Sequence, residues 1–176
     1  MPPDLRLLEW IAAHRADAPT DVARLLMAGG GSVVLGVGLA AAFILGIAIG
    51  QVGAVWMAVV AGGTASAVAT ALKALVDRPR PPADLALVTT SGTSMPSTIA
   101  ALTAGAALAL AFAVRWPSRG VRRTALGVLT FIVVLVGAAM IYLGAHWLTD
   151  VLAGWALGSA TAIAIAVPFA RLTRRS

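Results

Sequence analysis

The sequence contains no cysteine, and only 11% of its 176 residues are charged. Without cysteine, the chain has no disulfide bond, no thiolate nucleophile and no thiolate metal site. A soluble domain has about 25% charged residues, so this composition excludes a soluble enzyme and a disordered tail. The net charge is +6, but the basic residues are scattered among apolar runs and form no basic patch. Nucleic acid is therefore not an expected partner.

Apolar residues make up 60% of the sequence and gather in long runs. A membrane-spanning helix needs about 20 mostly apolar residues. We therefore predict an all-α fold, a polytopic membrane helical bundle with about five transmembrane helices surrounded by membrane lipids. Gly154 and Gly158 lie four residues apart, a spacing that allows helices to pack closely within the bundle. The five expected spans are residues 32–50, 52–75, 97–114, 124–144 and 151–170.

The N-terminal segment, residues 1–31, is too rich in charged residues to cross a bilayer. Its apolar residues Leu7, Trp10 and Ile11 recur at helical spacing, which predicts one or two amphipathic helices lying at the membrane interface. Pro19, with the Thr and Asp that follow it, indicates a break and a new helix start. We therefore divide the chain into an amphipathic interfacial segment, 1–31, and a transmembrane domain, 32–176.

The distribution of charge predicts the orientation in the membrane. Five spans place residues 1–31, 76–96 and 145–150 on one side, and the loop 115–123 and the C-terminal tail on the other. The second side carries seven arginines and no acid. The first carries six bases, counting Lys73 at the end of the second span, and all seven acids. Positive charge marks the cytoplasmic side. We expect a plasma-membrane protein with its N-terminus outside and its C-terminus in the cytoplasm.

The polar residues near the membrane collect on the expected outer side, where ionisable residues indicate a functional site. Lys73 and Arg80 are two cations suited to the oxygens of a phosphate group. Ser97 stands where the third span begins, and a helix N-terminus offers free N–H groups to an anion. His146 and Asp150 are four residues apart and share a helical face, so the carboxylate can orient the imidazole.

Each of these features also has a plainer interpretation when it is taken alone. Lys73 and Arg80 can be interfacial anchors, Ser97 can be a helix cap, and the histidine–aspartate pair can close a tight turn. Their occurrence in order on one predicted face favours a phosphate site facing outside.

The motifs resemble those of the type 2 phosphatidic acid phosphatase superfamily of integral membrane lipid phosphatases. Its first motif is Lys, six residues, then Arg-Pro, and Lys73, Arg80 and Pro81 match it fully. A second Arg-Pro, at Arg78, stands at a different spacing. The second motif is Pro-Ser-Gly-His, and Ser97 with the proline before it matches its start. The resemblance covers essentially the whole chain.

The third motif of that family is Ser-Arg, five residues, His, three residues, Asp. His146 and Asp150 match its end, and the similarity extends over residues 142–155. The resemblance implies that His146 attacks phosphorus to form a phosphohistidine and that Asp150 orients it. It implies that Lys73, Arg80 and Ser97 bind the phosphoryl oxygens. No metal and no cofactor takes part in the implied mechanism.

The sequence departs from the family pattern in two motifs. Thr98 and Ile99 stand where the second motif has Gly-His, whose histidine is the general acid, and Ala139 and Met140 stand where the third motif has Ser-Arg. General acid catalysis is worth about 10²–10⁴-fold. A diphosphate needs the acid less than a simple monoester does, because its leaving group is already a stable anion.

Two functions follow from this pattern. The first is a membrane phosphatase of weakened activity that hydrolyses a lipid or polyprenyl (di)phosphate at the outer membrane face and prefers the diphosphate. The alternative is a catalytically inactive family member that binds a lipid phosphate or acts as a membrane scaffold with a protein partner.

Overall fold

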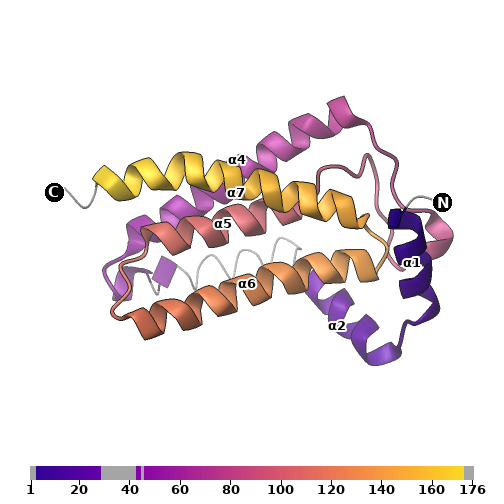
Figure 1. Cartoon of the computed structure of the whole chain (residues 1–176), viewed down its shortest axis with the longest axis horizontal. Coiled ribbons are helices and arrows are strands. Elements are labelled where there is room, and N and C mark those ends of the chain that lie inside the picture. The colour runs from indigo at the N-terminus through magenta and orange to yellow at the C-terminus, as the bar shows by residue number, and fades with distance from the viewer. Residues whose placement is uncertain (1–2, 29–42, 45, 173–176) are drawn as a thin grey trace.

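The computed structural model describes residues 3–28, 43–44 and 46–172, and within these ranges it contains helices and no strand (Figure 1). This confirms the predicted all-α membrane fold. The helices, with one short 3-10 helix η1, are α1 Pro3–Ala13, α2 Asp17–Ala28, α4 Val52–Val76, η1 Ala83–Leu85, α5 Thr98–Ala113, α6 Arg119–Tyr142 and α7 Leu148–Leu172.

Helices α4, α5, α6 and α7 run lengthwise through the bundle, and α5 packs against both α4 and α7 (Figure 1). Three of them, α4, α6 and α7, are long and apolar enough to cross a membrane, and α5 is apolar but has only 16 residues. The expected first span, residues 32–50, falls mostly outside the described residues.

Two spanning helices begin earlier than the apolar runs predict. Helix α6 was expected from Thr124 but begins at Arg119, because the Ser118 side chain accepts a hydrogen bond from the N–H of Val121 and caps the helix. Helix α7 was expected from Val151 but begins at Leu148. Its first turn contains Asp150, and a carboxylate is favourable near the positive end of a helix dipole. A serine cap begins α6 and a polar first turn begins α7, so apolar runs alone do not define these two starts.

The N-terminal segment forms two helices, as predicted, but the break between them lies elsewhere. Residues 14–16 separate α1 from α2, and α2 begins at Asp17. Pro19 consequently lies in the first turn of α2, where a proline is tolerated because the N–H it lacks would have no helical partner. Arg15, in the break, donates hydrogen bonds to the carbonyl oxygens of Tyr142 at 2.9 Å and Leu85 at 2.7 Å. The corner between the two helices is thus tied to the end of α6.

Small residues set the close contact between α5 and α7. A Cβ atom placed on Gly154 would lie 2.6 Å from the carbonyl oxygen of Ser97, and one on Gly158 would lie 2.2 Å from that of Ala101. The two glycines therefore pack directly on the α5 backbone, and their spacing serves packing within the bundle. This contact holds the first turns of the two helices in a fixed relation.

We expect the substitution Gly158→Ala to lower the free energy of unfolding by about 1–3 kcal/mol, because backbone atoms cannot yield to an added methyl group. Gly63→Ala on α4 is the matched control, since a Cβ there meets nothing within 4 Å. The control should be neutral or slightly stabilising because alanine favours helix. Thermal unfolding in detergent measures both, and equal stability of the two variants would contradict the packing argument.

Candidate active site

Four segments meet at one end of the bundle: the end of α4 with the loop after it, the start of α5, the turn between α6 and α7, and helix α1 (Figure 1). The N–H of Ser97 donates to the carbonyl oxygen of Asp150 at 3.0 Å, which joins the start of α5 to α7. The N–H of Ser94 donates to the carbonyl oxygen of Arg78 at 2.8 Å, which joins the two halves of the loop. Four of the five predicted site residues lie in these segments, and the fifth, Asp150, lies in the first turn of α7 directly after the turn.

The turn between α6 and α7 depends on a glycine. Gly144 has φ +71°, and a Cβ on it would lie 2.6 Å from the carbonyl oxygen of Leu85. Other residues rarely adopt this left-handed conformation, and none would fit here. The N–H of Ala145 then donates to the carbonyl oxygen of Met140 at 2.9 Å, which closes the turn directly before His146.

His146 and Asp150 form a buried pair. Nδ1 of His146 lies 3.3 Å from Oδ2 of Asp150, which is fully buried and also accepts a hydrogen bond from the N–H of Trp147 at 3.0 Å. A carboxylate can only accept, so the imidazole proton sits on Nδ1. Nε2 therefore carries the ring's free lone pair, the one a nucleophilic imidazole uses.

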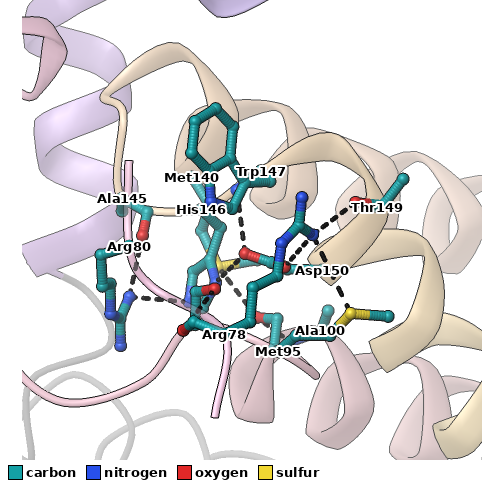
Figure 2. A network of polar contacts seen from close by, with 12 residues as sticks. Arg78, Arg80, Met95, Ala100, Met140, Ala145, His146, Trp147, Thr149 and Asp150 are labelled. Atoms are coloured by element: carbon teal, nitrogen blue, oxygen red, sulfur yellow. Dashed lines mark hydrogen bonds and ion pairs between the residues drawn. The ribbon is translucent and has the colours of Figure 1, made fainter. Parts of the chain in front are cut away.

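Arg80 faces that atom. Its Nη1 lies 3.2 Å from Nε2 of His146 and donates to the carbonyl oxygen of Ala145 at 2.8 Å (Figure 2). Nε and Nη2 donate to the carbonyl oxygens of Gly92 and Ser91, each at 3.3 Å. A phosphoryl group does not fit between two atoms 3.2 Å apart, so binding at Nε2 requires the guanidinium to move aside.

A cavity of about 480 Å³ provides space for that movement. Arg80 forms one of its walls, and the cavity lies against the loop that follows Arg80 in the chain. The remaining lining residues are Pro81, Ala83, Ala86, Leu87, Val88, Thr89 and Thr90. Arg80 therefore borders this cavity and also contacts the imidazole of His146.

Lys73 lies at the end of α4 and points into the loop before α5. Its Nζ donates to the carbonyl oxygens of Thr93 at 2.7 Å and Ser94 at 3.1 Å. Two of its three N–H groups are thus used on the loop. Its charge still acts on His146, where it disfavours the protonated imidazole.

The side chain of Ser97 contacts Met140. Its buried hydroxyl accepts a hydrogen bond from the N–H of Ala100 at 3.3 Å, which caps α5, and donates to Sδ of Met140 at 3.6 Å. Met140 is fully buried in an apolar cluster that includes Ala100 and the half-buried Ile99. The two residues that replace the family's arginine and histidine therefore pack in one apolar cluster, beside Ser97.

The structure adds two residues that sequence analysis did not place in the site. Arg78 donates from Nη1 to Oδ1 of Asp150 at 2.6 Å and from Nη2 to Oδ2 of Asp4 at 2.7 Å (Figure 2 shows the first contact). Its guanidinium also lies over the ring of Trp147, 5.4 Å from the centroid. In the sequence, the second Arg-Pro pair was the one feature that could have pointed to Arg78 as a site residue. Asp4 has no local signal, because it lies 74 residues away in the chain.

The charges around His146 keep it neutral. Burial lowers the pKa of His146 below its ordinary value, the charges of Arg80 and Lys73 lower it further, and the hydrogen bond to Asp150 offsets only part of this. Burial also lowers the pKa of Arg80, yet a guanidinium keeps its proton in proteins. Across the described ranges, no group of three or more histidine, aspartate or glutamate side chains is placed to hold a metal ion.

The fold and the site define an integral membrane protein that carries a histidine–carboxylate pair and a cationic loop at one end of a helical bundle. Residues 53–174 match the PAP2 superfamily, and the chain belongs to this family. The resemblance seen in the motifs is thereby confirmed. No curated protein matches the sequence.

Two solved structures share the fold. One is the first transmembrane PAP2 type phosphatidylglycerolphosphate phosphatase from Bacillus subtilis, with a TM-score of 0.79 and 24% identity, covering 92% of this chain and 82% of that chain. The other is LpxE from Aquifex aeolicus, with a TM-score of 0.74 and 22% identity, covering 93% of this chain and 94% of that chain. The similarity extends over nearly the whole of this chain, including the region before the family match.

The electrostatics of the site predict how His146 titrates. The chain has two histidines, so His14→Gln leaves His146 as the single source of imidazole signals. His14 is exposed, and its ring stacks on Trp10. In ¹⁵N-histidine NMR of this variant in detergent, we expect a titration midpoint below 6.5 and a neutral, Nδ1-protonated ring at pH 7. A midpoint at or above 6.5 would contradict the assignment.

Proposed function

We propose that this protein is a membrane phosphatase that hydrolyses a lipid or polyprenyl (di)phosphate through a phosphohistidine on His146. The observation that carries the proposal is the His146–Asp150 pair, whose imidazole turns Nε2 toward Arg80. Membership of the PAP2 superfamily supports the reaction class. One structural neighbour is a phosphatidylglycerolphosphate phosphatase, which supports a phospholipid phosphate as the substrate class.

In the proposed reaction, Nε2 of His146 attacks phosphorus, and the bond between phosphorus and the leaving oxygen breaks. The leaving group takes the electron pair, and the imidazole gains positive charge that Asp150 stabilises through Nδ1–H. Water then attacks the phosphohistidine, releases phosphate and restores the neutral imidazole. Lys73 and Arg80 neutralise the charge on the phosphoryl oxygens during both steps.

The missing general acid determines the preferred substrate. Ile99, where the family has its acid, contributes no proton, and it packs with Met140. A simple monoester would release an alkoxide, which needs that proton. A lipid diphosphate attacked at its terminal phosphorus releases a lipid monophosphate, which is a stable anion. The diphosphate is therefore the better substrate for this site.

The proposed site faces the outside of the cell. Asp4, Arg78 and His146 lie at one end of the bundle, and the arginine-rich loop 115–123 connects α5 to α6 at the other. Positive charge marks the cytoplasmic side, so the arginine-rich end is cytoplasmic. A lipid phosphate of the outer leaflet then reaches the site directly.

We expect purified protein to release phosphate from a lipid diphosphate at least about 100-fold faster than from the corresponding monophosphate, because only the monoester needs the general acid. His146→Ala should abolish release from both, and His14→Ala should retain it. Faster turnover of the monophosphate would contradict the proposed substrate. Equal rates for the His146→Ala and unmodified proteins would contradict the nucleophile.

A second candidate function has one specific observation in its favour. Ser97 stands where the family has a phosphate ligand, but its hydroxyl donates a hydrogen bond to Met140. Met140 itself stands where the family has the arginine that would complete the phosphate site. A protein with this site could hold a lipid phosphate through Lys73 and Arg80 without hydrolysing it. It would then serve as a membrane scaffold or a partner of another protein.

Restoring the two replaced residues separates the candidates. In the double variant Ile99→His and Met140→Arg, we expect phosphate release to rise at least about 100-fold, with the largest gain on the monophosphate, because the general acid returns. Thermal unfolding must show that the variant is folded, since Met140 is fully buried. No gain in a folded double variant would favour the binding function.

A further inference from the structure

A chain of alternating charges connects the N-terminal helix to His146. Asp4 of α1 contacts Arg78 at 2.7 Å, Arg78 contacts Asp150 at 2.6 Å, and Asp150 contacts His146 at 3.3 Å. The side chains of Asp4 and Arg78 are 10% and 26% exposed, and Asp150 is fully buried, so water screens these contacts little. Thr149 donates a hydrogen bond to Asp4 and accepts one from Arg78.

We propose that Asp4 and Arg78 are positioning residues that set how strongly the Asp150 carboxylate supports positive charge on His146. This proposal rests on the function proposed above, in which His146 carries that charge after it attacks phosphorus. Neither residue touches the imidazole, so both act through Asp150.

The two oxygens of the Asp150 carboxylate have different partners. Oδ1 accepts from Arg78, whereas Oδ2 accepts from His146 and from the N–H of Trp147. A guanidinium on Oδ1 offsets the negative charge that His146 experiences and disfavours an imidazolium nearby. Arg78 alone would therefore weaken the support that Asp150 offers.

Asp4 counteracts this effect of Arg78. Its carboxylate binds the opposite nitrogen of the guanidinium, so the positive charge of Arg78 is shared between two carboxylates. Burial acts to raise the pKa of Asp4, but hydrogen bonds from Thr149 and Arg78 more than offset it, so the pKa lies below its ordinary value and Asp4 is ionised at neutral pH. With Arg78 neutralised from its far side, Asp150 keeps its charge for His146.

This arrangement predicts opposite effects from two substitutions. Asp4→Asn leaves Arg78 with Asp150 as its single carboxylate partner, which should lower the pKa of His146. Arg78→Gln removes the positive charge next to Asp150, so the full carboxylate charge acts on His146 and should raise the pKa of His146. A residue that only supported the fold would shift the titration in one direction in both variants, or in neither. The other charged groups facing His146, Arg80 and Lys73, stay unchanged throughout.

The experiment uses the full chain in detergent with His14→Gln, so that His146 is the single histidine observed by NMR. We expect Asp4→Asn to lower the protonation constant of His146 at least about threefold and Arg78→Gln to raise it at least about threefold, half a pKa unit each. The double variant should lie between them. Asp4→Glu should restore the original midpoint.

Asp21→Asn is the matched control, because it removes one carboxylate from the exposed surface of α2 and should leave the midpoint unchanged. Shifts of the same sign in Asp4→Asn and Arg78→Gln, or a shift of Asp4→Asn no larger than that of the control, would overturn the proposal. If Arg78→Gln does not fold, the sign of the Asp4→Asn shift decides alone.

The titration distinguishes this proposal from the proposed function, because it requires no turnover. Opposite shifts in a protein that releases no phosphate would support the positioning roles and refute the phosphatase. Phosphate release that depends on His146, together with unshifted titrations, would support the phosphatase and refute the positioning roles.

Discussion

The end of the bundle depends on the pairing of the buried Asp150 carboxylate with its hydrogen-bond donors. A buried charge is costly unless it is paired and hydrogen-bonded, and Asp150 is bound by Arg78, His146 and the N–H of Trp147. Its carbonyl oxygen also accepts from the N–H of Ser97 at the start of α5. The loop after α4, the turn before α7 and the first turns of two helices are therefore held around one residue, through its side chain and its carbonyl oxygen.

The polar contacts of His146 and the apolar cluster next to Ser97 differ in the chemistry they offer. Arg80 and the Asp150 carboxylate contact its two ring nitrogens, whereas Met140 and Ile99 belong to an apolar cluster beside Ser97. In the proposed function, the site thus keeps the groups that place and orient a nucleophile and lacks the groups that would supply a proton and a further cation. This combination suits chemistry in which the leaving group needs no proton.

Much of this arrangement could be predicted from local patterns in the sequence. The four-residue spacing predicted that His146 and Asp150 are neighbours. The length of the apolar runs predicted the spanning helices. Both are local patterns that can be recognised without knowing the fold. The contact of Arg78 with Asp4 could not be predicted, because it joins residues 74 positions apart that share no periodic pattern. The starts of α6 and α7 also differed from the prediction, because hydropathy does not register a serine cap or a polar first turn.

The match to the family model begins at residue 53, whereas α1, which precedes it, contributes a carboxylate that reaches Arg78. The boundary of the recognised domain and the boundary of the charged network are therefore different. A fragment cut to the family match would keep His146, Asp150 and Arg78 but would lose the anion at the far end of the network. Under the roles proposed for Asp4 and Arg78, the amphipathic N-terminal helix contributes to the charge around His146, so a change in α1 alters the electrostatics at the far side of the bundle end.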